Sequence, residues 1–168
     1  MILKKLYMSK YMLFASACII ILGSCLNEPE FSKIPEIAFL GMTQNVFTQS
    51  FSPTDSTRVT ISFQDGDGDI GGDSLAIFVT DTRTDNLESE FRILEIPIEG
   101  VSNAISGEIS FPIFTTCCIF DDGSGRVPCT PTNNPVLEEE LVYEIFIKDR
   151  AGNESNKILI DPILLRCE

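Results

Sequence analysis

The stretch TRVTISF, from Thr57 to Phe63, carries the clearest strand pattern in the chain. Val59, Ile61 and Phe63 alternate with short polar residues. Because successive side chains of a strand point to opposite faces, this spacing turns one face toward a core and the other toward solvent. The stretch therefore predicts a half-buried β-strand.

Other short runs share this β-branched and aromatic character, and none shows a convincing helical period. They are residues 36–42, 74–81, 91–98, 107–114, 141–149 and 157–165. About seven such strands separated by turn-rich loops predict an all-β fold, an antiparallel immunoglobulin-like β-sandwich. The chain has no tryptophan, so the usual cysteine–tryptophan–cysteine core is missing and the likeness concerns architecture only.

Residues 1–24 predict a secretory signal peptide. Lys4, Lys5 and Lys10 form a basic start, and an uncharged apolar run follows from Tyr11 to Gly23. The run is shorter than the about 20 apolar residues that a transmembrane helix needs. A membrane-anchor helix is the alternative interpretation.

Leu22-Gly23-Ser24-Cys25 resembles the lipobox of bacterial lipoproteins. The resemblance implies that Cys25 carries a diacylglyceryl group with fatty acids such as palmitate, and that it begins the mature protein. Leu26 stands where an aspartate would favour inner-membrane retention, which implies an outer-membrane location, periplasmic-facing or at the cell surface. Residues 25–35 would then be a lipidated tether, and residues 36–168 the sandwich domain.

Charge excludes several kinds of partner. The sequence holds 12 basic and 25 acidic residues, and three lysines leave with the signal peptide, so the mature chain carries 9 − 25 = −16. This balance argues against nucleic acid and against electrostatic attraction to anionic lipid, and it suits cation binding. The absence of histidine removes the commonest general base and the usual zinc ligand.

Four cysteines remain in the domain, namely Cys117, Cys118, Cys129 and Cys167. An even number in an exported chain predicts disulfides, and no CxxC spacing supports a metal instead. The strand order places all four at one end of the sandwich. Cys117 and Cys118 are adjacent and point apart in an extended segment, so each takes a separate partner. We expect Cys118–Cys129, closing a Cys-rich insert at 115–135, and Cys117–Cys167, with the swapped pairing as the alternative.

The stretch FQDGDGDIGGDS, Phe63 to Ser74, gathers the densest like charge in the chain. Its four carboxylates belong to Asp65, Asp67, Asp69 and Asp73. Ca²⁺ takes six to eight oxygen ligands, and glycines between carboxylates let a tight loop wrap around it. The loop therefore predicts a calcium site, with an ordinary solvated turn as the alternative.

An EF-hand does not fit this loop. Counting from Asp65, the sixth residue is Ile70 where a glycine is required, and the twelfth is Ala76 where a glutamate should stand. The loop lies between strands and lacks ligands by itself. Asp149 and Asn153, in the loop 149–156 at the same end of a sandwich, are candidates to complete it, although Asn153 equally suits a turn.

A resemblance follows from these motifs. FQDGDGDIGG (63–72) and IKDRAGNESN (147–156), downstream of a lipobox, are similar to those of a group of uncharacterised lipoproteins from the Bacteroidota. In that group the two motifs frame one β-sandwich. The resemblance implies no established activity, and the insert at 115–135 is not part of its pattern.

The sequence favours a protein that is not an enzyme. Catalysis needs a nucleophile with a base, or an acid/base pair, and a small sandwich offers little cleft for a carboxylate pair such as Asp121-Asp122. Two functions stay open. One is a surface binding module for an unknown protein or glycan, and the other is a structural or accessory subunit of an outer-membrane complex.

The lipobox yields a direct test of anchoring. In cells of a lipoprotein-processing bacterium, Cys25→Ser should abolish fatty-acid labelling of the full chain, because no thiol remains to accept the diacylglyceryl group. Cys18→Ser, within the apolar run, is the matched control and should label normally. Unchanged labelling of the Cys25 variant would refute the assignment.

Overall fold

The computed structural model describes residues 31–72, 75–94, 96, 103–120, 123, 125–132 and 137–168. These residues form ten β-strands and no helix, which confirms the predicted all-β sandwich. The signal peptide, Cys25 and Asp73 lie outside them. Within the described part, no helix is long and apolar enough to cross a membrane.

The first layer of the sandwich is a three-stranded antiparallel sheet in the order β1-β3-β6. Its strands are β1 (Glu36–Met42), β3 (Ser56–Asp65) and β6 (Ile105–Phe114). The central strand β3 contains TRVTISF and pairs with β6 along its whole length, from Ser56↔Phe114 to Asp65↔Ile105. The strand predicted from alternation is therefore the middle of its sheet.

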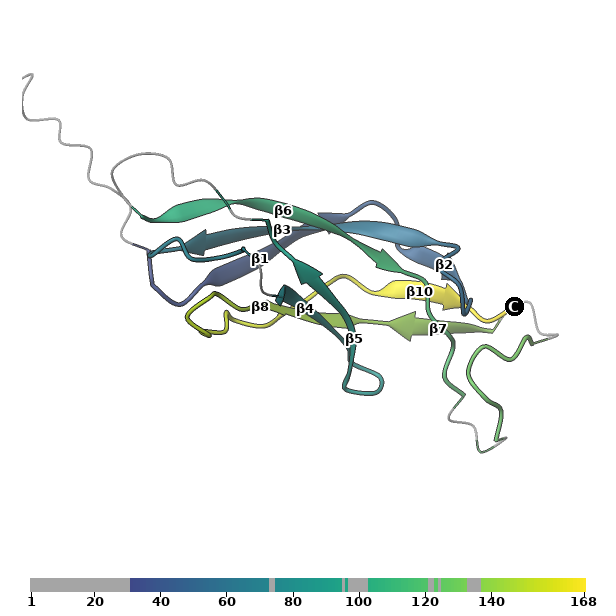
Figure 1. Ribbon diagram of the computed structural model, residues 1–168. Helices are drawn as coiled ribbons and strands as arrows, with labels where there is room; N and C mark the ends of the chain where they lie inside the picture. The colour runs from purple at the N-terminus through teal and green to yellow at the C-terminus, as the bar shows by residue number, and fades with distance from the viewer. Residues whose placement is uncertain are drawn as a thin grey trace, which may run out of the picture.

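The second layer contains two ladders, β5-β4-β8-β9 and β2-β10-β7. Their strands are β4 (Leu75–Asp81), β5 (Asn86–Arg92), β7 (Glu138–Leu141), β8 (Tyr143–Ile147), β9 (Ile158–Leu159), β10 (Ile163–Arg166) and β2 (Val46–Thr48). The Ile163↔Leu141 and Glu144↔Leu159 pairs differ in register by one residue, so the run β7–β8 and the run β9–β10 form one interrupted hairpin. Figure 1 shows this hairpin lying along the sheet β1-β3-β6.

The segment from β1 to β2 passes from one layer to the other. β1 pairs antiparallel with β3, whereas β2 pairs parallel with β10.

An apolar groove with a volume of about 660 Å³ lies between the edge strands β5 and β6. Phe63, Phe91, Ile93 and Phe111 line it.

The core lies between the layers and is built from the alternating residues of the central strands. The hydrophobic strand residues with no exposed surface come from β3, β4, β7, β8 and β10: Val59, Ile61, Val79, Leu141, Tyr143, Ile145, Ile147, Ile163 and Leu165. On the outer face of β4 and β8, Phe78 stacks on Phe146 with ring centroids 4.9 Å apart. This cross-strand pair ties the two strands together outside the core.

Two strand predictions are wrong. The stretch 91–98 was expected to be a strand, but β5 comes earlier, at Asn86–Arg92 (NLESEFR). Charged side chains at an edge hide the period-2 pattern and protect the edge from pairing with another chain. β2 was not expected either, because a three-residue strand has too short a pattern and is formed by its pairing with β10.

The acidic residues Glu138 to Glu140 form most of β7. The Glu139 carboxylate accepts a hydrogen bond from the Ile119 N–H (2.8 Å) and an ion pair from Arg83 (3.0 Å). These donors explain how an acidic run enters a strand beside the core.

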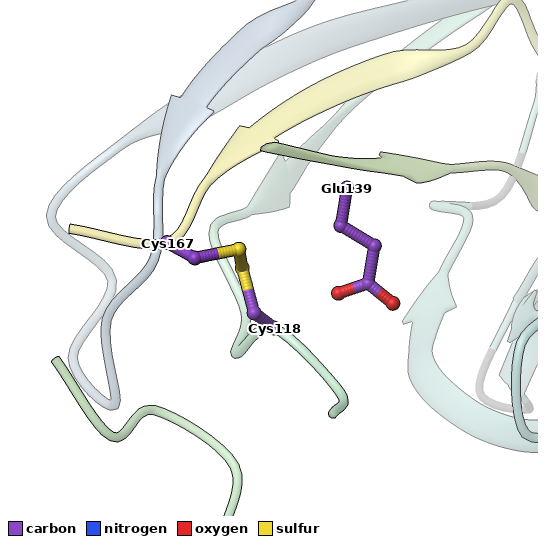
Figure 2. A group of neighbouring side chains, drawn as sticks. All are labelled: Cys118, Glu139 and Cys167. Atoms are coloured by element: carbon purple, nitrogen blue, oxygen red, sulfur yellow. A yellow bond between two sulfur atoms is a disulfide. The ribbon is translucent and has the colours of Figure 1, made fainter. Parts of the chain in front are cut away.

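All four thiols lie at one end of the sandwich, as predicted. The disulfides are Cys117–Cys129 and Cys118–Cys167, so the preferred pairing was wrong and the alternative is the one found. Cys118 and Cys167 have 0% and 1% of their surface exposed, which places this bridge in the core (Figure 2). The inward side of the extended segment therefore belongs to Cys118, and Cys117 turns outward toward Cys129.

The two bridges should contribute unequally to stability. Replacing both Cys118 and Cys167 with alanine should lower the free energy of unfolding by about 4 kcal/mol, since the bridge closes a long loop. The matched double variant, Cys117→Ala with Cys129→Ala, removes a bridge that closes a shorter loop, so it should lower the free energy of unfolding by about 3 kcal/mol or less. Urea unfolding of oxidised proteins measures both. A larger loss for the Cys117/Cys129 pair would contradict this ordering.

Candidate functional site: an acidic cluster at one end of the sandwich

Two facing strands carry aspartates into the same end of the core. On β3, Val59, Ile61, Phe63 and Asp65 are all buried, because the period of two that buries the apolar residues continues to Asp65. On β8, the same alternation runs through Ile145 and Ile147 and reaches Asp149, just past the strand end.

The loop after β3 adds two further carboxylates. Asp65, Asp67, Asp69 and Asp149 each offer an oxygen, and these oxygens lie within 4.8 Å of one another. Asp65 and Asp149 are buried, with 0% and 4% of their surface exposed, while Asp67 and Asp69 are half-buried. The structure thus brings together four of the six residues that the sequence nominated as metal ligands.

The loop is held in place by a core anchor and by backbone contacts. Ile70 is 2% exposed and belongs to the hydrophobic core. Gly68 has φ +68°, and a Cβ there would overlap the carbonyl oxygen of Asn103. Glycine meets both requirements, since it adopts positive φ without strain and leaves room for the neighbouring chain.

The hairpin 149–156 is tied directly to the aspartate loop. The Arg150 N–H and its Nε donate to the Asp69 carbonyl oxygen at 3.2 and 3.1 Å. The Ala151 N–H donates to Asp69 Oδ2 at 3.0 Å. Arg150 was not singled out from the sequence. Its position next to Asp149 in DRAGN was the available signal.

Asp65 and Asp69 each have one carboxylate oxygen that is fixed by a hydrogen bond and one that has no partner among the described residues. Asp65 Oδ2 accepts from the Asp69 N–H at 2.9 Å, and Asp69 Oδ2 accepts from Ala151. The Oδ1 atoms of Asp65, Asp67 and Asp69 are buried and find no hydrogen-bond donor among the described residues. Buried charged oxygens without a donor are costly unless a cation supplies the partner.

Asn153 has a supporting position. Its N–H donates to Asp149 Oδ1 at 2.7 Å, and its side-chain Nδ2 donates to Asp149 Oδ2 at 2.8 Å. The amide therefore orients the Asp149 carboxylate, which keeps further lone pairs for a cation. The remaining nominated residue, Asp73, lies outside the described residues.

The electrostatics of the cluster raise two pKa values. The pKa of Asp65 is raised above its ordinary 3.8, chiefly by burial and then by the charges of Asp67, Asp69 and Asp149. The pKa of Asp69 is raised by burial, Asp149 and Asp67. Without a cation, folding therefore disfavours the ionised forms of Asp65 and Asp69.

A second group of possible ligand atoms, Cys118, Glu139 and Cys167, has a different character (Figure 2). Its two sulfurs are bonded to each other, so neither is a thiolate. The Glu139 carboxylate already receives the Ile119 N–H and Arg83. This group is therefore a disulfide beside an ion pair, and not a metal site.

Comparison with known proteins adds no assignment. No protein-family model matches the chain, and no curated protein or solved structure matches it. The resemblance to the Bacteroidota lipoproteins stays a prediction.

The raised pKa of Asp65 predicts a pH dependence in the presence of a chelator. An acid whose pKa rises on folding stabilises the folded state most when protonated, and this contribution is lost as pH rises from its unfolded pKa through the folded one. Between about pH 4 and pH 7, wild type should lose more free energy of unfolding than Asp65→Asn. At neutral pH and in chelator, Asp65→Asn should therefore have a higher free energy of unfolding than wild type.

Urea unfolding at several pH values measures this difference. Asp161→Asn, at an exposed residue between β9 and β10, is the control and should follow wild type. Parallel curves for wild type and Asp65→Asn would show that Asp65 is not strained by its neighbours.

Proposed function

We propose that this protein is a calcium-stabilised β-sandwich lipoprotein, anchored through Cys25 to the outer membrane, that acts as a non-catalytic binding module. The observation that carries the proposal is the cluster of Asp65, Asp67, Asp69 and Asp149, in which three buried oxygens have no donor within the part of the chain that the structure describes. A divalent cation supplies what these oxygens need and offsets their mutual repulsion. Two like charges about 4 Å apart cost about 4 kcal/mol at an effective dielectric constant of 20.

The donor set favours Ca²⁺ over other metals. All the ligand atoms are carboxylate oxygens, which suit hard cations, and the chain has no histidine for zinc. Oxygens on opposite sides of a Ca²⁺ lie about 4.6–5.2 Å apart, because each is about 2.3–2.6 Å from the ion. The four carboxylate oxygens of the cluster lie within 4.8 Å of one another, so one ion can reach all of them. Mg²⁺ requires a tighter shell, at about 2.0–2.1 Å.

The chemistry of the cluster supports a structural role for the cation. Asp65 and Asp149 are buried, and Asp69 is fixed by the hairpin, so an ion there would join the loop after β3 to the loop after β8. The chain offers no histidine as a general base beside it. Stabilisation of the loops therefore accounts for the cluster without a reaction.

The binding role rests on the groove between β5 and β6. Its volume of about 660 Å³ and its apolar lining, with Arg92 and Glu108 among its residues, suit a ligand with an apolar body and polar ends. The alternative, a subunit docked on an outer-membrane complex, is favoured by exposed apolar side chains at the disulfide end. Phe51 is 82% exposed and Val127 67%.

Calcium should stabilise the protein by ligand linkage. At a Ca²⁺ concentration a hundredfold above the Kd, linkage adds about 2.7 kcal/mol to the free energy of unfolding and raises the Tm by several degrees. Asp67→Asn should blunt this rise because it removes one of the charged ligands. Mg²⁺ should raise the Tm less than Ca²⁺.

Scanning calorimetry and a calorimetric titration of the full chain in mild detergent measure these effects. Asp161→Asn is the control and should respond to Ca²⁺ as wild type does. The absence of binding heat and of any Tm shift at millimolar Ca²⁺ would overturn the calcium assignment.

A further inference from the structure

The chain segment that enters the domain is hydrogen-bonded to both loops of the acidic cluster. The Gly66 N–H, in the aspartate loop, donates to the Ser32 carbonyl oxygen at 2.7 Å. On the hairpin side, the Ile37 N–H donates to Asn156 Oδ1 at 2.8 Å, and Asn156 Nδ2 donates to the Ile37 carbonyl oxygen at 2.9 Å. Ser32 is therefore attached to the aspartate loop, and Ile37, which begins β1 and pairs with Phe63 of β3, is also attached to the hairpin.

The contact at Gly66 is too close for any other residue. A Cβ on Gly66 would overlap the Phe31 carbonyl oxygen and lie 2.9 Å from the Ser32 carbonyl oxygen. Because Gly66 lies between Asp65 and Asp67, a displacement of the aspartate loop would move Gly66 and break its hydrogen bond to Ser32. The entering segment is thus fitted to one position of the loop.

The contact at Asn156 depends on the hairpin. Ser155 is buried, its N–H donates to the Ile147 carbonyl oxygen at 2.9 Å, and its hydroxyl accepts the Ile147 N–H at 3.0 Å. Asn156 is the next residue, and the Ser155 hydroxyl donates to the Asn156 carbonyl oxygen at 2.8 Å. The side chain that holds Ile37 is therefore positioned by the same hairpin that begins at Asp149.

We infer that a cation in the acidic cluster clamps residues 31–35, the segment before β1, onto the sandwich, and so sets the greatest distance that the chain between Cys25 and the domain can span. This inference rests on the proposed function, which supplies the cation and the anchor. Without the ion, repulsion among the four carboxylates separates the two loops. Each loop then withdraws its attachment from the entering segment.

The change in reach follows from chain geometry. Five residues lie between Cys25 and Phe31, and the six Cα–Cα steps that join the two span at most about 20 Å when extended. Release as far as Glu36, the first residue of β1, gives eleven such steps and allows about 36 Å. The cation therefore holds the domain close to the lipid and restricts its orientation.

Trypsin provides the test, because Lys33 lies exposed within the clamped segment. The full chain in mild detergent is digested in millimolar Ca²⁺ or in chelator, and cleavage after Lys33 is followed by mass spectrometry. Calcium should slow this cleavage by about tenfold, because proteolysis follows the population of the open form. Cleavage after Arg126, at the disulfide end, is the internal control and should not respond to Ca²⁺.

Asn156→Ala separates the clamp from the ion. The variant keeps all four carboxylates, so it should bind Ca²⁺ in the calorimetric titration while losing most of the protection at Lys33. Asn86→Ala, at an exposed residue at the start of β5, is the matched control and should keep the protection. Hydrogen exchange of wild type gives a second reading, since the Gly66 and Ile37 amides should exchange slowly only with Ca²⁺.

The outcomes distinguish the two proposals. If Ca²⁺ binds and cleavage after Lys33 is the same with and without it, the clamp is wrong and the calcium site stands. If no Ca²⁺ binds, both are wrong. Calcium-dependent protection that Asn156→Ala removes without loss of binding establishes the clamp.

Discussion

The period of two along β3 and β8 is the constraint on which the rest of the structure depends. The register that buries Val59, Ile61 and Phe63 also buries the next residue of the same parity, Asp65, and on β8 the same rule leads from Ile147 to Asp149. A shift of one residue would expose these aspartates, but it would expose the whole apolar face as well. The fold therefore places two carboxylates inside, and the loop that follows β3 adds two more.

The two ends of the sandwich are held by different means. At one end, Cys118–Cys167 bonds the segment after β6 to the segment after β10, and Arg83 joins Asp81 to Glu139 beside it. At the other end, the described residues of the loops 65–72 and 149–156 meet through carboxylates and through hydrogen bonds from Arg150 and Ala151 to Asp69, with no covalent bond between them. A covalent end holds under any ionic condition, whereas an end made of like charges depends on what neutralises them. The proposed cation therefore acts at the end without a disulfide, where the segment that enters the domain is attached to the two loops.

Prediction from sequence worked where a residue's position followed from local periodicity. Alternation located β3, and the loop order placed the aspartates at one end and the cysteines at the other. It did not work where the partner strand decides the outcome. β5 carries charges because it is an edge, β2 exists because β10 lies beside it, and the cysteine pairing depends on which of two adjacent side chains turns inward. The structure adds that the Asn153 amide donates to the Asp149 carboxylate, and its nomination as a ligand stays a prediction.

By itself the sequence determined the all-β class, the acidic loop, the end of the sandwich at which the thiols gather, and the residues available for a cation, since these follow from composition and from a period of two. Only the tertiary structure decided that Asp149 meets Asp65, that Cys118 bonds to Cys167, and that Ser32 and Ile37 are attached to the two loops. The physical reason is that these contacts join residues on different strands and in different layers. Their distances depend on how the sheets pack, and no local pattern in the chain records that packing.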